Sequence, residues 1–193
     1  MNQALRLTLR DIAAFLRSEK LPFAVIGGIA VGLRGEPRFT ADVDLVIGAD
    51  VDRALSFLRA VEGSSFVPLF ADVSEVVASA FIIPLRHRKT GIKVDLAIGL
   101  TGFERQLLER AENLPLGGVQ LPVATAEDLL LMKVLADRPR DAEDARRIVD
   151  RQGPNLDWAY VLEMGRQLQE AISQDIVAKL RQLQGSPEDP QAP

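Results

Sequence analysis

Short apolar runs that end at glycine or proline are mixed along this chain with stretches in which apolar residues recur at helical spacing. The runs that indicate strands are residues 23–26, 42–47, 66–70, 80–85, 93–98 and 119–123. The stretches that indicate helices are residues 3–18, 29–33, 52–60, 103–111, 125–135, 139–150 and 158–184. Because the two kinds are mixed rather than strictly alternating, we expect an α/β or α+β fold in which helices flank a mixed β-sheet.

The length of 193 residues predicts one main domain with at most a small appendage. We expect residues 1–150 to form that domain and residues 151–184 to form a C-terminal helical segment packed on it. Residues 185–193 contain three prolines and are expected to be a disordered tail.

Cysteine is absent and histidine occurs once, as His87. This composition excludes zinc fingers, iron–sulfur clusters, thiol nucleophiles and metal sites built mainly from imidazole. A bound metal would therefore be held by oxygen ligands, which favours Mg²⁺, Mn²⁺ or Ca²⁺.

The overall charge and hydropathy exclude two further classes of protein. The net charge is −4 and aromatic residues make up 5% of the chain, so a basic face for broad nucleic-acid binding is not indicated. No apolar run approaches the ~18 residues that cross a membrane, and the N-terminus lacks the apolar core of a signal peptide. We expect a cytoplasmic protein without membrane contacts.

Three acidic residues interrupt apolar strand sequences. Asp42 and Asp44 are two residues apart, so both project from one face of a strand, and Asp95 is a single acid within another strand. Clustered carboxylates repel one another, and a divalent cation would remove that penalty. If the strands are neighbours, the three acids could hold one or two Mg²⁺ ions. The alternative is that Asp42 caps a strand end and that Asp44 and Asp95 are exposed at an edge.

Two glycines precede this acidic pair. Gly27 and Gly28 follow a strand and precede a helix, where backbone N–H groups can approach a phosphate closely. Arg38 and Thr40 lie between these glycines and the acids and are candidates for phosphate or base contacts. A Gly-Gly turn with a purely structural role is the alternative. Together with the acids, the set contains what nucleotidyl transfer from a metal-bound triphosphate requires.

Four motifs in this order resemble the polymerase-beta-type nucleotidyltransferase superfamily. The resemblance is to its abortive-infection toxin branch, the nucleotidyltransferase half of bacterial toxin–antitoxin and phage-defence pairs. The segments that carry it are residues 25–31, 38–44, 124–133 and 138–144, together with Asp95. It implies a nucleotidyltransferase fold over roughly residues 20–150.

The resemblance also implies roles for single residues. Asp42 and Asp44 would bind Mg²⁺ or Mn²⁺, and Asp95 would be the third catalytic carboxylate and metal ligand, helping to activate the acceptor hydroxyl. Gly27 and Gly28 would cradle the triphosphate. Lys133 would contact phosphate, and Asp141 would belong to a final motif of the nucleotide site.

Two charged residues have simpler alternatives. Lys133 is the only charge between Asp128 and Asp137, so its side chain either extends to solvent along apolar neighbours or reaches a nearby anion. His87 lies among basic residues near a predicted turn and is either solvated there or part of a basic finger that touches an RNA backbone.

These observations lead to a hypothesis of Mg²⁺-dependent transfer of a nucleoside monophosphate from an NTP to an acceptor. The acceptor would be an RNA 3′ end, in particular of a tRNA, or a protein hydroxyl, and the resemblance implies a toxin neutralised by an antitoxin protein. Ile29 stands where many members of the superfamily have Ser or Thr. This departure motivates the alternative of a catalytically degenerate module that binds a nucleotide or a partner.

Overall fold

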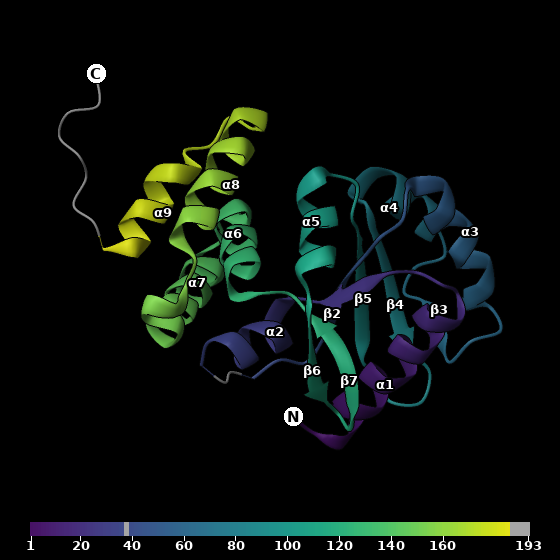
Figure 1. Ribbon diagram of the computed structural model, residues 1–193. Helices are drawn as coiled ribbons and strands as arrows, with labels where there is room; N and C mark the ends of the chain where they lie inside the picture. Colours follow the sequence, from purple (N-terminus) through teal and green to yellow (C-terminus); the bar gives the residue numbers. More distant parts are fainter. Residues whose placement is uncertain (37–38, 186–193) are drawn as a thin grey trace. The chain divides into compact units, whose positions relative to one another are not determined.

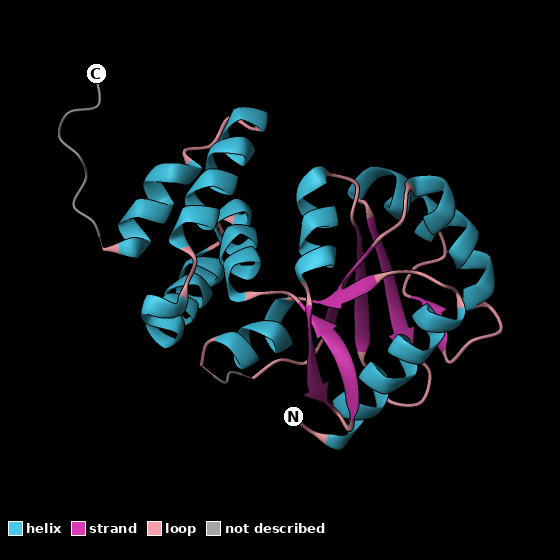
Figure 2. Ribbon diagram, in the orientation of Figure 1, coloured by secondary structure: helices cyan, strands magenta, loops and turns pink. Residues whose placement is uncertain are grey.

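The structure is a computed structural model that describes residues 1–36 and 39–185. Its internal contacts divide the chain into two compact units. The sheet unit comprises residues 1–30 and 39–124, and the helical unit comprises the described residues of 31–38 and 125–193. Figure 1 shows the elements of both units along the chain, and Figure 2 shows that the described strands lie in the sheet unit.

A seven-stranded mixed sheet forms the centre of the sheet unit, in the order β3-β4-β5-β2-β1-β7-β6. The strands are β1 Phe23–Val25, β2 Val43–Ile47, β3 Phe66–Pro68, β4 Ile82–His87, β5 Lys93–Ile98, β6 Glu112–Leu116 and β7 Val119–Val123. β2 pairs with β5, and β1 with β7, in parallel, whereas the remaining pairs are antiparallel. The expected mixed sheet flanked by helices is confirmed.

Helices belong to both units. The sheet unit contains α1 Gln3–Ser18, α3 Val51–Val61, α4 Val73–Ala80 and α5 Gly102–Arg110. The helical unit contains α6 Ala126–Ala136, α7 Pro139–Gln152, α8 Trp158–Ala171 and α9 Ile176–Gln184, with a short 3-10 turn at Gly153–Asn155. α2 Gly27–Arg34 begins in the sheet unit and ends in the helical unit.

The two faces of the sheet differ in chemistry. Phe66 of β3 lies opposite His87 of β4 on one face of the sheet. On that face the ring of Phe15 of α1 stacks on Phe66, with 6.2 Å between centroids, and packs at a tilt against Phe57 of α3, with 5.0 Å between centroids. Alternation along β4 and β5 then places Asp95 on the other face. The aromatic core is thus separated from the acids by the thickness of the sheet.

Two elements were not expected from the sequence. α4 follows β3 in a stretch without a clear helical stripe, and of its residues only Val73 and Val77 are buried. β6 is an edge strand in which only Leu116 is buried. Its apolar and polar residues therefore alternate too weakly to predict a strand from the sequence.

The prediction of a single helix over residues 158–184 is wrong. Ile172 has an extended backbone (φ −135°, ψ 148°), and the Asp175 side chain accepts a hydrogen bond from the Ala178 N–H as the N-cap of α9. At Gly165 a Cβ would lie 2.5 Å from Leu180 Cδ1, so the glycine allows α8 and α9 to pack closely. The break therefore produces a helical hairpin.

The helical unit has its own apolar core. Its buried residues include Leu129, Leu130, Leu131, Val134, Ala145, Ile148, Val161, Met164, Ile176 and Leu180. α6 and α7 group with α8 and α9, so the compact units divide after Ala124, whereas the sequence placed the boundary at residue 150. Of the predicted tail, residues 186–193 lie outside the described residues. Within the described part of the chain, no helix combines the length and the apolar character needed to traverse a bilayer.

Candidate active site

The turn after β1 is built against a carboxylate of β2. The backbone N–H of Ile26 donates to the carbonyl oxygen of Asp44 at 3.0 Å. Gly27 follows with φ +62°, and a Cβ at this position would lie 2.0 Å from Asp44 Oδ2. Glycine is therefore required here for two reasons: the left-handed backbone and the space that the Asp44 carboxylate occupies. Gly27 and Gly28 are the first residues of α2, which begins two residues earlier than the sequence predicted. Phosphate binding at this turn stays a prediction.

Asp44 and Asp95 are direct neighbours in the sheet. β2 and β5 run parallel with Asp44 in register with Asp95, so both side chains project from the same face. Adjacent strands lie about 4.8 Å apart, which brings the two carboxylates within reach of a shared cation. Asp42 is exposed two residues before Asp44, immediately ahead of β2. The alternative that Asp44 and Asp95 lie on an exposed sheet edge is wrong, because β2 and β5 are interior strands.

A lysine that the sequence analysis did not single out lies among these acids. Lys93 Nζ is 2.7 Å from Asp95 Oδ2. The hydrogen bond with Asp95 raises the pKa of Lys93; burial opposes the rise, and the negative charges of Asp95, Asp42 and Asp44 support it. The sequence signal for Lys93 is its spacing from Asp95. Two residues that are two apart on one strand project from the same face of the sheet.

The oxygen atoms at this position fit a divalent cation in part. Asp95 Oδ1 is buried and has no hydrogen-bond partner among the described residues. Carboxylate oxygens are the ligands that Mg²⁺ prefers. In the described ranges, no three Asp, Glu, His or Cys side chains are grouped closely enough to hold a metal ion. The pair Asp44 and Asp95, with one unsatisfied oxygen, is thus the part of the predicted metal site whose arrangement fits.

We predict that replacing Lys93 by methionine increases the response of the protein to divalent cations. Without the ammonium group the carboxylates repel one another, so thermal unfolding should occur about 2–4 °C lower, as for the loss of an exposed pair worth up to ~1 kcal/mol. Added Mn²⁺ should then raise the unfolding midpoint more in this variant than in the wild type. The control is Lys179→Met, which removes an ion pair with Asp137 in the helical unit. Equal Mn²⁺ responses in all three proteins would contradict a cation site at these acids.

Other predicted site residues near the acids are placed as follows. The Thr40 hydroxyl donates to the backbone carbonyl of Asp42 at 3.4 Å, which ties the loop that enters β2. Ile29 is 6% exposed and packs in the core, so it offers nothing polar to a phosphate. Arg38 lies outside the described residues.

Lys133 and Asp141 meet each other in the helical unit. Lys133 Nζ lies 2.6 Å from Asp141 Oδ1 and 3.0 Å from Asp144 Oδ2, and Arg138 Nε donates to Asp141 Oδ2 at 2.5 Å. The Lys133 side chain is 11% exposed, so the alternative in which it extends to solvent is wrong. It reaches anions instead, and in this structure those anions are the two carboxylates of α7.

The same cluster gives a pH dependence with a defined sign. Burial raises the pKa of Asp141, but hydrogen bonds from Lys133 and Arg138 and their charges outweigh burial and hold it below the ordinary value. A carboxyl group whose pKa is lower in the folded than in the unfolded protein stabilises the fold at pH values above its ordinary pKa of about 4. This stability is lost as the pH falls toward the pKa of the folded state.

We therefore predict a steeper loss of stability below about pH 4 in the wild type than in Asp141→Asn, which lacks this titration. Urea unfolding between pH 7 and pH 3 measures the difference. Parallel pH curves for the two proteins would show that Asp141 titrates normally in the folded state.

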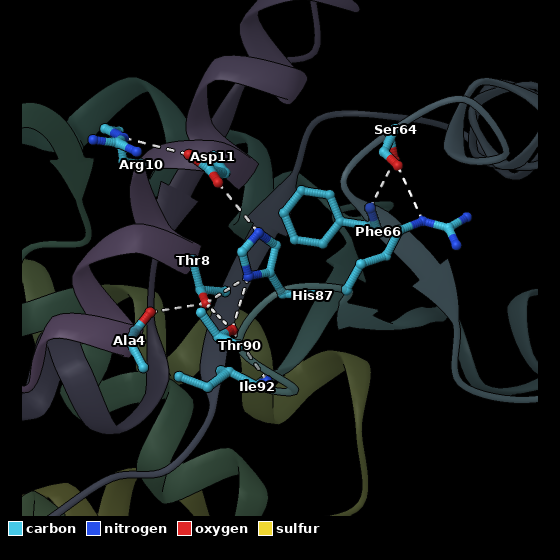
Figure 3. A network of polar contacts seen from close by, with 10 residues as sticks. Ala4, Thr8, Arg10, Asp11, Ser64, Phe66, His87, Thr90 and Ile92 are labelled. Carbon is cyan, nitrogen blue, oxygen red and sulfur yellow. Dashed lines mark hydrogen bonds and ion pairs between the residues drawn. The ribbon is translucent and has the colours of Figure 1, made fainter.

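His87 occupies neither of the environments expected from the sequence. Its side chain is 1% exposed, and its ring lies 5.1 Å from that of Phe66. Nδ1 is 2.8 Å from Thr90 Oγ1, and Nε2 is 3.2 Å from Asp11 Oδ2 (Figure 3). Both the solvated turn and the basic finger are wrong for this residue, because β4 extends to His87 and points it into the core below α1.

Solved structures with a similar fold are nucleotidyltransferases. An antigenic nucleotidyltransferase-like protein from Paracoccidioides brasiliensis is 19% identical, with 92% of each chain covered and a TM-score of 0.53. The antibiotic-resistance factor ANT(2″)-Ia is 15% identical, with 89% of this chain and 94% of that chain covered and a TM-score of 0.58. A second structure of ANT(2″)-Ia, in complex with adenylyl-2″-tobramycin, is 15% identical, covers 92% and 97% of the two chains and has a TM-score of 0.54. At these identities the likeness establishes the fold.

The sequence itself identifies the family. No curated protein matches it. Residues 4–172 match the family described as "Nucleotidyltransferase of unknown function (DUF6036)". The matched range includes both the Gly27 turn and the Lys133 cluster. With this match over most of its length, and with Asp44, Asp95 and Gly27 arranged on the corresponding fold, the chain belongs to this nucleotidyltransferase family.

Proposed function

We propose that the protein transfers a nucleoside monophosphate from an NTP to a hydroxyl acceptor in a reaction that requires Mg²⁺ or Mn²⁺. The observation that carries this proposal is the in-register pair Asp44 and Asp95, with Asp95 Oδ1 unsatisfied, beside the glycine turn that begins α2. Acids of this kind have no evident role in stabilising the sheet, because two neighbouring carboxylates repel each other.

The triphosphate is bound by the turn and the acids together. The first N–H groups of α2, from Gly27 and Gly28 onward, have no partner within the helix and favour an anion. Ile29 is buried, so phosphate contacts here come from the backbone. Asp42 and Asp44 would hold the cation, with Asp95 as the third ligand. When bound, Mg²⁺ neutralises the phosphate oxygens and aligns the α-phosphorus with the acceptor.

The transfer itself needs one group that removes a proton. The acceptor oxygen forms a bond to the α-phosphorus, the bond from that phosphorus to the bridging oxygen breaks, and pyrophosphate leaves with the electron pair. Asp95 Oδ1 accepts the proton of the acceptor hydroxyl, while Lys93 holds Oδ2 at 2.7 Å and fixes the direction of the carboxylate.

Four further residues remain proposed nucleotide contacts. Arg38 and Thr40 precede the acids in sequence and belong to the predicted phosphate or base contacts. Lys133 and Asp141 follow in the helical unit, and a phosphate at Lys133 would share its ammonium group with Asp141 and Asp144.

The proposed acceptors are the 3′ end of a tRNA or a protein hydroxyl, within a cytoplasmic toxin that an antitoxin protein neutralises. The family resemblance of the sequence supports this biology. A catalytically degenerate module that binds a nucleotide or a partner is the second candidate, and the buried Ile29 in place of a hydroxyl residue favours it.

A panel of acceptors tests the proposal and identifies the acceptor class. The protein is incubated with each of the four NTPs labelled at the α-phosphate, with Mg²⁺, and with total tRNA, with no added acceptor, or with an aminoglycoside mixture. Label on RNA or on the protein supports the proposed acceptors, and label on a small molecule would replace them. NTP binding with no label on any acceptor would favour the degenerate module.

A further inference from the structure

A groove at one end of α1 has no part in the candidate active site. It has a volume of about 630 Å³ and is lined by residues that include Gln3, Arg6, Arg10, Lys89, Thr90 and Gly117. They come from the first turns of α1, from the turn between β4 and β5, and from the turn between β6 and β7. We propose that this groove binds the phosphodiester backbone of an RNA.

The lining of the groove is positively charged. Arg6, Arg10 and Lys89 are exposed there, and the groove has no acidic residue in its lining. The N-terminus of α1 opens at Gln3 and adds its partial positive charge. In a chain with net charge −4, this concentration of cations gives the groove a preference for anions.

The groove is held in shape by the buried polar network of His87. Thr8 Oγ1 of α1 lies 2.7 Å from Thr90 Oγ1, and His87 joins Thr90 on one side of its ring to Asp11 of α1 on the other (Figure 3). Asp11 also lies 3.3 Å from Arg10 Nε, which leaves Arg10 partly neutralised. The helix that carries Arg6 and the turn that carries Lys89 are thus connected through the buried Thr8 and His87 and the partly buried Asp11 and Thr90.

The spacing of the cations favours a nucleic acid strand over a single phosphate or an acidic peptide. Arg6 and Arg10 are one helical turn apart, about 6 Å along the axis, which is comparable with the separation of successive phosphates in a strand. The lining residues named above include no aromatic side chain, so the groove offers backbone contacts and no stacking platform. The turn that carries Lys89 leads into β5, so a bound RNA would lie where that strand begins, whereas the Asp95 side chain projects from the face of the sheet opposite α1. RNA binding here does not depend on the proposed transfer reaction.

Equilibrium binding without NTP or metal tests this proposal separately from catalysis. A fluorescently labelled tRNA is titrated with wild-type protein, with Arg6→Glu/Lys89→Glu, and with the control Arg59→Glu/Arg166→Glu, which changes the net charge equally at exposed positions elsewhere. We expect the groove variant to bind at least tenfold more weakly than the control. Loss of two phosphate contacts should also reduce the slope of log affinity against log salt by about 1.5.

Three outcomes would overturn the proposal. The first is equal RNA affinity of the groove and control variants, and the second is that the wild type does not bind RNA at about 50 mM salt. The third is that poly-glutamate binds the wild type as tightly as RNA does, which would assign the groove to an acidic protein. If the glutamate variant does not fold, Arg6→Gln/Lys89→Gln gives the same comparison with a smaller expected loss.

Discussion

Replacing Asp95 by asparagine is expected to reduce nucleotidyl transfer by about a thousandfold or more, since a positioned base contributes 10²–10⁴ in rate. Asparagine keeps the shape of the side chain but cannot accept the proton of the acceptor hydroxyl at Oδ1. NTP binding should change little, because Asp42, Asp44 and the glycine turn remain. Initial rates with an α-labelled NTP and calorimetry with a nonhydrolysable NTP measure the two effects.

Asp44→Asn is the matched variant for this experiment. It removes a charge that we propose holds the cation and that lies against Gly27, so both NTP–Mg²⁺ binding and transfer should fall. If Asp95→Asn weakens NTP binding as much as Asp44→Asn while retaining transfer, the division of roles between the two strands is wrong.

The second large effect is expected in the helical unit. Replacing Lys133 by methionine leaves the buried carboxylates of Asp141 and Asp144 without their shared cation. Removing one partner of a buried ion pair typically costs 3–5 kcal/mol in the free energy of unfolding. Hydrogen exchange of α6 and α7 during urea unfolding measures the loss in this unit.

The control for Lys133 is Lys179→Met. The Lys179–Asp137 pair is partly exposed, at 35% and 58% for the two side chains, and its loss should cost less than ~1 kcal/mol. Similar stability of the two variants would show that the Lys133 cluster is not a buried network in solution. NTP affinity measured on Lys133→Arg, which keeps the charge, then tests the proposed phosphate contact separately from stability.

The sequence predicted the elements whose signals are local. The helical stripe from Leu5 to Leu16 and the apolar runs at β1, β2 and β5 define elements close to those found. The Gly27 turn was also visible, because a strand, two glycines and a helix follow one another. The sequence did not show which side chain lies beside Gly27. The Asp44 carboxylate occupies the space of the missing Cβ only because β1 pairs with β2.

The misread residues are those whose partners are distant in the chain. The arginines beside His87 favour a solvated turn, yet Asp11 and Thr8 of α1 cover its ring. Lys93 had no distinguishing local pattern, and only the position of Asp95 on the same strand indicates its role. The break at Ile172 was missed because apolar residues continue through it at nearly helical spacing, while Asp175 offers a cap whose strength the pattern does not reveal.

The position of the label distinguishes nucleotidyl transfer from every other use of an NTP at this site. Wild-type protein and Asp95→Asn are incubated with Mg²⁺, total tRNA and either α-labelled or γ-labelled NTP. The account predicts that the wild type attaches the α-label covalently to an acceptor, releases the γ-label as pyrophosphate in equal amount, and that Asp95→Asn does neither. Transfer of the γ-label, or release of inorganic phosphate without any attached label, would contradict it.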